Sequence, residues 1–163
     1  MNIFFDTEFI DTGREVHLLS IGMVREDGAT YYAEPDDAPK HLACEWVQKN
    51  VLPHMTGPAM PRLQIKWDLV DFAGSNPLFW AYYGAYDWLC LCQLFGRMLD
   101  VPVHWPNMVM DVQQVRVMRG VRDLPKQDTT EHNALNDAIW TKQAWEFLTK
   151  PQMMGLHGIQ RGH

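Results

Sequence analysis

The sequence lacks a long hydrophobic run and any sign of an export signal. None of its apolar stretches approaches the roughly 18 residues that a membrane span requires. The N-terminus has no charged segment followed by a long apolar stretch. We therefore expect a cytoplasmic protein without membrane attachment.

Cysteine is scarce, which excludes a disulfide framework and a thiolate metal site. Cys44, Cys90 and Cys92 are odd in number and form no Cys-x-x-Cys pair. They lie in apolar surroundings, such as the run LCLC at residues 89–92. We interpret all three as buried thiols in a reducing compartment.

Basic residues are also few: 14 Lys and Arg stand against 20 Asp and Glu, and the formal net charge is −6. Extensive binding to duplex nucleic acid is disfavoured, because such binding relies on Lys and Arg. An enzyme that holds only a few nucleotides remains compatible with this charge if cations offset part of it. One weakly basic stretch fits either a phosphate-binding rail or a solvated helix face: Arg116, Arg119, Arg122 and Lys126.

What is present is the composition of one folded domain. A chain of 163 residues with 47% hydrophobic residues can bury a core, which argues against disorder. No repeat or linker divides it. We expect a single domain over residues 1–150 and a loosely ordered C-terminal tail over residues 151–163.

Residue patterns predict three strands followed by alternating helices and strands. Residues 2–9 and 17–25 are rich in β-branched and apolar residues, and Asp27-Gly28 before residues 29–34 is typical of a tight hairpin turn. The other predicted elements are helices over 38–51, 62–72, 86–95, 111–119 and 134–148, a loop over 53–61, a buried strand over 77–83 and a short strand over 108–110. This order indicates an α/β fold with a mixed sheet, whose first three strands are antiparallel, flanked by helices.

Two acidic residues stand one position apart near the end of the first predicted strand. Because a strand alternates its faces, Asp6 and Glu8 project together while Thr7 points to the other face. Neighbouring carboxylates repel each other, and a hard divalent cation such as Mg²⁺ relieves the repulsion. The pair predicts a metal site, although a lone Asp-x-Glu pair on an edge strand is more often solvated surface.

Two further acidic positions and one histidine fall where helices are predicted to begin. Asp87 lies in the first turn of the helix over residues 86–95. With Asn133 as N-cap of the last helix, His132 lies on the entering loop and Asp137 in the early helix, and both can face one edge of the sheet. Alone, Asp87 is most simply a carboxylate favoured by a helix N-terminus, and His132 a loop residue. Their joint occurrence favours one site shared with the acidic pair.

Other acidic residues and histidines lack such a context. Three aspartates are interpreted as helix caps or surface residues: Asp111, Asp123 and Asp128. Four histidines lie outside any metal-ligand spacing and are interpreted as structural: His17, His41, His54 and His104.

At these positions the chain resembles the DEDD 3′-5′ exonucleases of the ribonuclease-H-like fold. DTE at residues 6–8 is similar to the first motif of that family, YGAYD at 83–87 to the second and HNALND at 132–137 to the third. A histidine five residues before the last aspartate, with Asn133 rather than Tyr four before it, resembles the histidine subclass, DEDDh. Within it, the chain is most similar to the small bacterial and phage exoribonucleases related to mycobacterial RNase AS, whose substrates are polyadenylated RNAs.

The resemblance implies a two-metal mechanism for cutting single-stranded RNA from its 3′ end into 5′-mononucleotides, with oligo(A) as a candidate substrate. Two Mg²⁺ or Mn²⁺ ions about 4 Å apart would clamp the attacking and leaving oxygens. Asp6 would contact both ions, Glu8 and Asp137 the ion that carries the nucleophile, and Asp87 the other. His132 would accept a proton as general base.

Substrate contacts are implied by the residues beside these motifs. In the family, the backbone and ring at the position of Phe9 touch the terminal nucleotide, so Phe9 is a candidate for base stacking. Most members carry Thr there. Tyr86 is a second candidate, whereas Trp88 lies on an apolar helical stripe and is predicted to be core.

Three alternatives remain open. A DNA exonuclease of the same superfamily differs in its contact with the 2′-hydroxyl group, which the sequence does not reveal. The second is a binding module that kept the fold without the chemistry, although all five expected side chains are present. A small-molecule phosphoesterase would use the same metals. Many relatives work as homodimers, so a second copy of the chain is a candidate partner.

Overall fold

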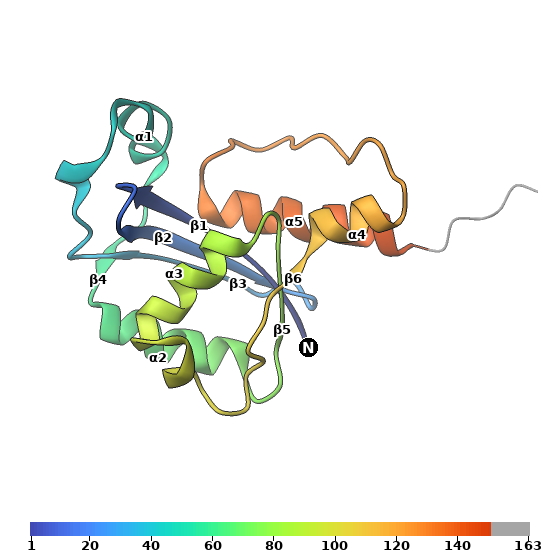
Figure 1. The fold of residues 1–163 in the computed structure, drawn as a ribbon, viewed down its shortest axis with the longest axis horizontal. Helices are drawn as coiled ribbons and strands as arrows, with labels where there is room; N and C mark the ends of the chain where they lie inside the picture. The colour runs from blue at the N-terminus through green and yellow to red at the C-terminus, as the bar shows by residue number, and fades with distance from the viewer. Residues whose placement is uncertain (151–163) are drawn as a thin grey trace, which may run out of the picture.

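A six-stranded mixed sheet with the order β4-β3-β2-β1-β5-β6 forms the centre of the computed structural model, which describes residues 1–150 (Figure 1). Its first three strands are antiparallel, as predicted: β1 (Asn2–Asp11), β2 (Val16–Arg25) and β3 (Thr30–Pro35). The other strands pair in parallel with their neighbours: β4 (Ala59–Met60), β5 (Leu78–Ala81) and β6 (Met110–Asp111). The predicted tail over residues 151–163 lies outside the described residues.

Helices cover both faces of the sheet. α2 (Arg62–Ala73) and α3 (Ala85–Phe95) lie on one face, and α5 (Ala134–Thr149) lies on the other (Figure 1). The alternation of β1 follows these layers, because Ile3 and Phe5 belong to the core cluster that contains α2 and α3, while Phe4 belongs to the cluster that contains α5. By the same alternation, the β1 side chains at positions 6 and 8 face α5.

Gly22 lets α5 approach the sheet at backbone distance. It lies opposite Asp6 in the register of β1 and β2. A Cβ atom added to Gly22 would lie 2.2 Å from the backbone nitrogen of Leu135. The absence of a side chain here therefore brings the first turn of α5 directly over the acidic strand.

The helix predicted over residues 38–51 is wrong in part, because it is divided. A 3-10 helix, η1 (Lys40–Leu42), is followed by the extended residue Ala43 and then by α1 (Glu45–Asn50). Ala43 is buried in a small core cluster, and its carbonyl accepts a hydrogen bond from the Gln48 side chain at 2.7 Å instead of a helical one. Cys44 lies at this break and is exposed, so its prediction as a buried thiol is also wrong, whereas Cys90 and Cys92 are buried.

The remaining predicted elements are confirmed with small shifts of their ends. The predicted loop over 53–61 contains the end of a second 3-10 helix, η2 (Leu52–His54), and the short strand β4. A third, η3 (Met98–Asp100), follows α3, and α4 (Val112–Met118) begins after β6. In α2, Leu63 is 63% and Trp67 55% exposed, whereas Val70 and Phe72 pack against the core. No helix within residues 1–150 combines the length and apolar character needed to cross a membrane.

Candidate active site

One cavity of about 330 Å³ collects every side chain that the sequence proposed for the site. It lies where β1, the start of α3 and the start of α5 meet. Its lining comprises Asp6, Thr7, Glu8, Phe9, Tyr82, Tyr83, Tyr86, Asp87, His132 and Asp137. These residues are separated by up to 131 positions in the chain, so the fold alone brings them together.

Asp87 reaches β1 from the α3 side of the sheet. β5 pairs with β1 only as far as Phe4, which leaves the backbone N–H of Thr7 without a strand partner on that side. Asp87 takes the place of that partner: its Oδ1 accepts hydrogen bonds from the Thr7 N–H at 2.8 Å and from the Thr7 hydroxyl at 2.7 Å. Thr7 and Asp87 are both buried. Thr7, whose side chain points away from Asp6 and Glu8, thus holds the carboxylate of Asp87 in place.

The turn that carries Asp87 is itself held by an aspartate. Asp111 caps α4 through the Gln113 N–H at 2.7 Å, as predicted. Its carboxylate also accepts the N–H groups of Gly84 at 3.1 Å and Tyr83 at 3.4 Å, just before α3 begins. This second role was missed, because it depends on β5 and β6 being neighbours in the sheet.

His132 and Asp137 approach from the α5 side, and the predicted N-cap explains how. The Asn133 side chain accepts the N–H of Asn136 at 3.2 Å, so the helix starts at Ala134 and His132 stays outside it. His132 has a left-handed backbone with φ of 63°, and its N–H donates to Asp137 Oδ2 at 3.0 Å. The prediction that both residues face one spot is confirmed in geometry.

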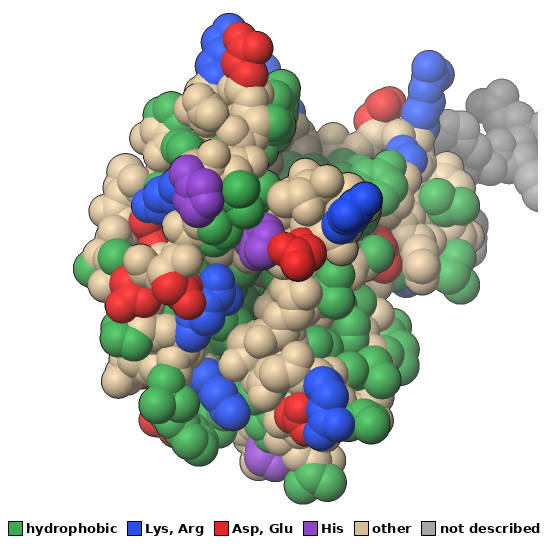
Figure 2. All heavy atoms as spheres, turned by 60° about the vertical axis from the view of Figure 1, so that its left-hand side comes forward, with side chains coloured by type: hydrophobic (Ala, Val, Ile, Leu, Met, Phe, Trp, Pro, Cys, Tyr) green, Lys and Arg blue, Asp and Glu red, His purple; other side chains and the backbone are tan. Residues whose placement is uncertain are grey.

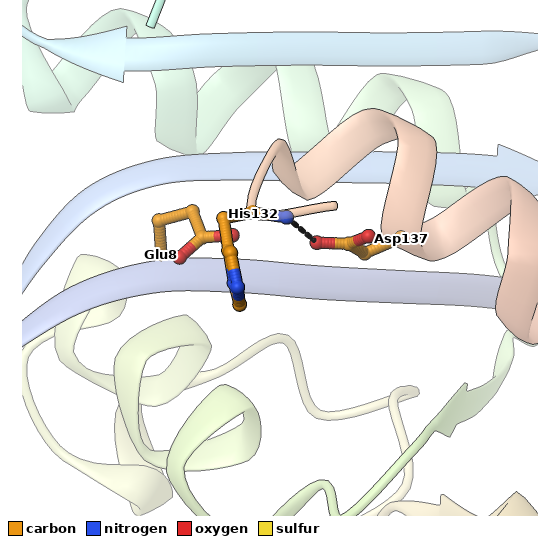
Figure 3. A group of neighbouring side chains, drawn as sticks. All are labelled: Glu8, His132 and Asp137. Atoms are coloured by element: carbon orange, nitrogen blue, oxygen red, sulfur yellow. Dashed lines mark hydrogen bonds between the residues drawn. The ribbon is translucent and has the colours of Figure 1, made fainter. Parts of the chain in front are cut away.

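Glu8, His132 and Asp137 form the tightest group in the cavity. One ligand atom from each lies within 4.8 Å of the others. Figure 3 shows Glu8 extending from β1 and Asp137 from the first turn of α5, with His132 between them. The carboxylate oxygens of Glu8 and Asp137 at this separation fit a hard divalent cation, and the His132 imidazole lies beside them.

The raised pKa values of the carboxylates in the cavity also favour a bound cation. Desolvation raises the pKa of Asp6 well above its usual range, and the carboxylates of Asp87, Glu8 and Asp137 raise it further. Desolvation, followed by repulsion from Asp137 and Asp87, raises the pKa of Glu8 to about 8. Four carboxylates this close can all be ionised at neutral pH only if positive charge joins them.

The remaining two carboxylates are also shifted, although their hydrogen bonds oppose the shift. Desolvation raises the pKa of Asp87 to about 6 against the bonds from Thr7. Desolvation also raises the pKa of Asp137, against bonds from Gln127 and from the His132 backbone.

Three contacts around His132 and Asp137 were not predicted. The Gln127 side-chain amide donates to Asp137 Oδ1 at 2.6 Å. The Trp46 ring meets the His132 ring edge-on, with centroids 4.9 Å apart. The Asn133 amide donates to the His54 carbonyl at 2.9 Å. No local pattern marks these residues, because each contact depends on where a loop crosses the end of the sheet.

Phe9 and Tyr86 stack on each other at the rim of the cavity. Their ring centroids are 5.1 Å apart and their planes differ by 6°. A base can therefore meet this pair only on an outer face, unless the rings separate. Their role in substrate binding stays a prediction. Trp88, predicted to be core, packs against the core cluster of α2 and α3.

A second chamber of about 470 Å³ adjoins the cavity on the α5 side and shares Asp6, Tyr82, His132 and Asp137 with it. Of the predicted basic stretch, only Lys126 lines this chamber. Arg116 is instead bonded to the Gln113 side chain and to a backbone carbonyl. Figure 2 shows acidic, basic and histidine side chains interspersed with hydrophobic ones, and no continuous basic surface on this side.

Comparison with known proteins identifies relatives over nearly the whole described chain. The family model described as the 3′-5′ exoribonuclease Rv2179c-like domain matches residues 1–149. Two proteins of Mycobacterium tuberculosis, named 3′-5′ exoribonuclease MT2234.1 and 3′-5′ exoribonuclease Rv2179c, are each 39% identical to this chain over 146 residues. The matched region covers 85% of this chain and 87% of each relative.

Solved structures support the fold. Exonuclease I in its apo form matches 91% of this chain with a TM-score of 0.63 and 15% identity. E. coli Exonuclease I in complex with a dT13 oligonucleotide matches 86% with a TM-score of 0.60 and 12% identity. The chain spans only 41% and 39% of the length of these structures, and the likeness confirms the predicted ribonuclease-H-like fold. The match over residues 1–149 and the 39% identity to both relatives show that this chain belongs to the family of Rv2179c-like 3′-5′ exoribonuclease domains.

Proposed function

We propose that this protein is a metal-dependent 3′-5′ exoribonuclease that releases 5′-mononucleotides from single-stranded RNA. One observation carries the proposal: four carboxylates and an imidazole, drawn from β1, α3 and the start of α5, line a single cavity. Both M. tuberculosis relatives are named as 3′-5′ exoribonucleases, which supports the choice of reaction and of RNA. Residues 1–150 are proposed to form the whole catalytic domain.

The four carboxylates would hold two Mg²⁺ or Mn²⁺ ions: Asp6, Glu8, Asp87 and Asp137. Their oxygen atoms, together with the raised pKa values of Asp6 and Glu8, fit hard divalent cations. When bound, the cations supply the positive charge that the carboxylates and the scissile phosphate both require. Asp87 approaches from α3 and Asp137 from α5, so the two lie on different sides of Asp6.

His132 is proposed to accept the proton of the attacking water. It lies against Glu8 and Asp137, and its backbone N–H is tied to Asp137 Oδ2. The edge-on contact with Trp46 restricts the ring further. The backbone of His132 is thus held by Asp137 and its ring is packed against Trp46, which supports its proposed role as general base.

The terminal nucleotide is proposed to lie beside Glu8 and Phe9, with Tyr86 supporting Phe9 from behind. The stacked pair offers an apolar face next to the acidic cluster. A preference for oligo(A) is part of the proposal, through the resemblance to RNase AS. A second copy of the chain remains a candidate partner.

The proposal is tested by incubating the protein with Mg²⁺ or Mn²⁺ and matched 5′-labelled RNA and DNA oligomers. We expect an RNA ladder that shortens from the 3′ end one nucleotide at a time, with 5′-mononucleotide as the product. The Asp6→Asn variant serves as the control for a contaminating nuclease. Equal or faster trimming of the DNA oligomer contradicts the RNA assignment, and release of internal fragments contradicts the exonuclease assignment.

A further inference from the structure

Backbone strain within residues 1–150 is concentrated at the proposed active site. Among the non-glycine residues there, only His132, with φ of 63°, and Tyr83, with φ of 58°, adopt the left-handed region. Both line the cavity that holds the acidic cluster. Bulky side chains rarely adopt this conformation, and residues held in it cluster at functional sites. The proposed function uses His132 but gives Tyr83 no role.

Tyr83 is fixed by three neighbours: Asp111, Gln113 and Tyr82. Its N–H and that of Gly84 donate to the two carboxylate oxygens of Asp111. Its hydroxyl accepts a hydrogen bond from the Gln113 amide at 3.0 Å. Its ring meets the Tyr82 ring edge-on, with centroids 4.7 Å apart. The ring is therefore held in one orientation at the mouth of the cavity.

The same ring is 62% exposed, so burial does not compensate for its strained backbone. A turn that only needed a left-handed residue would be served better by Gly or Asn, which adopt this conformation at lower cost. A rigid, exposed aromatic ring is instead the feature that proteins use to stack an unpaired base.

The position of Tyr83 indicates which base it meets, on the basis of the proposed function. Water activated by His132 attacks phosphorus, and the bond to the 3′-oxygen of the penultimate nucleotide breaks on the opposite side. His132 lies on the α5 side of the cavity, and Asp87 lies on the α3 side. The leaving nucleotide therefore departs toward Asp87 and the turn before α3. Tyr83 belongs to this turn, and its ring extends toward Gln113 at the start of α4.

We propose that Tyr83 is the platform on which the base of the penultimate nucleotide stacks. Phe9 and Tyr86 line the neighbouring part of the rim and are stacked on each other, so they serve the terminal nucleotide. The two aromatic sites place one base on each side of the scissile phosphate. Tyr83 thereby anchors the RNA that remains after each cut.

The test removes the Tyr83 ring, the base that it is proposed to contact, or both, and compares the effects. Tyr83→Gly removes the ring while it relieves the left-handed strain, so the variant is expected to fold. Two RNA oligomers are compared, one intact and one whose penultimate nucleotide carries ribose without a base. Tyr83→Phe keeps the ring, and Trp67→Ala removes an exposed aromatic ring on α2 as a matched control.

For the intact oligomer, Tyr83→Gly is expected to lower kcat/KM by roughly tenfold or more, with most of the change in KM. For the base-less oligomer, the same substitution is expected to change kcat/KM far less. Tyr83→Phe keeps the ring but loses its bond to Gln113, so its loss on the intact oligomer is expected to be smaller than that of Tyr83→Gly. Trp67→Ala is expected to stay close to wild type on both oligomers. Equal losses on both oligomers, or no loss on the intact one, would overturn the proposal.

Fluorescence anisotropy with both oligomers, in the Asp6→Asn background with Mg²⁺, separates this inference from the proposed function. If the wild type trims no RNA, the proposed function fails. A Tyr83-dependent preference for the intact oligomer in binding would still support the platform. Equal binding of both oligomers, or no binding, would overturn it. Normal trimming without the Tyr83 effect overturns the platform alone.

Discussion

At the scale of single residues, Asp137 has each carboxylate oxygen held by a different donor. Oδ2 accepts the backbone N–H of His132, and Oδ1 accepts the Gln127 amide. The first donor is fixed by the helix start, but the second comes from a loop side chain. The hydrogen bond from Gln127 can therefore be removed by mutation to test how Asp137, a proposed metal ligand, is oriented.

Replacing Gln127 with Ala should weaken Mn²⁺ binding by about tenfold, because groups that orient a metal ligand typically contribute that much. Titration of the protein with Mn²⁺ by isothermal calorimetry measures the change directly. Gln64→Ala is the matched control, because the Gln64 side-chain amide also donates to an aspartate, Asp68, but this pair lies on α2 outside the cavity. Unchanged Mn²⁺ affinity in Gln127→Ala would show that the hydrogen bond does not orient Asp137.

Asp6 has the most crowded carboxylate of the cavity, since the other three all raise its pKa. Asp6→Asn should lower RNA turnover by roughly 10³-fold or more, as loss of a central electrostatic group does. In metal-free buffer at pH 8 the same variant should have a higher Tm than wild type, because one source of repulsion is gone. Differential scanning calorimetry with EDTA checks the second expectation, and a lower Tm would contradict it.

At the scale of elements, the contact between β2 and α5 decides where His132 and Asp137 lie. Gly22 sits beneath the first turn of α5, and a side chain there would collide with backbone atoms of Ala134 and Leu135. Backbone atoms cannot rotate away as the end of a flexible side chain does. The start of α5 must therefore move if position 22 gains a Cβ atom.

Gly22→Ala should destabilise the fold by about 2 kcal/mol, the usual range for overpacking, and should also weaken Mn²⁺ binding. Chemical denaturation followed by tryptophan fluorescence gives the first value, and calorimetry gives the second. Gly28→Asn is the control, because Gly28 has open space around it and a left-handed φ of 93° that Asn tolerates. Equal stability of Gly22→Ala and wild type would mean that α5 is free to shift.

The elements that the sequence predicted well are those whose signals are local. Period-two alternation placed Asp6 and Glu8 on one face of β1, and the N-cap Asn133 placed His132 outside α5. The helix over residues 38–51 failed because Ala43 turns inward to a core that only the folded chain provides. Leu63 and Trp67 of α2 are apolar and helically spaced yet exposed, because spacing alone does not determine which side of a helix is buried.

The supports of the site were beyond sequence reasoning for the same reason. Trp46 and Asp111 lie 86 and 27 positions from the residues they contact, and Gln127 reaches Asp137 from a loop 10 positions away. Tyr83 carries no local signal for its left-handed backbone. The gathering of the candidate residues in one cavity was thus predictable from the order of the motifs, whereas the contacts that support these residues were not.

At the scale of the whole molecule, the acidic cavity links stability to pH. The pKa of Glu8 rises from an ordinary 4.5 to about 8 in the folded chain, and that of Asp87 rises from 3.8 to about 6. Between the ordinary and the raised pKa values, the folded state binds more protons than the unfolded state. The free energy of unfolding therefore falls as pH rises through this interval. The contribution is fully present below about pH 4 and lost by about pH 8.

Without metal, Tm should therefore decrease between pH 5 and pH 8, and added Mn²⁺ should raise Tm more at pH 8 than at pH 5. Cations compete with protons for the same carboxylates, so they bind better where the protons have left. Thermal scans with EDTA and with Mn²⁺ at both pH values measure the effect. A metal-free Tm that stays constant over this interval would show that the cavity does not control stability.

The two hydrogen bonds from Thr7 to Asp87 would link the binding of RNA to the binding of cations. An oxygen has two lone pairs, and Thr7 occupies both of those on Asp87 Oδ1. If Asp87 binds a cation as proposed, it would offer one oxygen and act as a monodentate ligand. A cation on that side would complete its coordination sphere with solvent or with a phosphate of the RNA. Its residence time would then rise when RNA arrives, so metal loading and substrate loading would be cooperative.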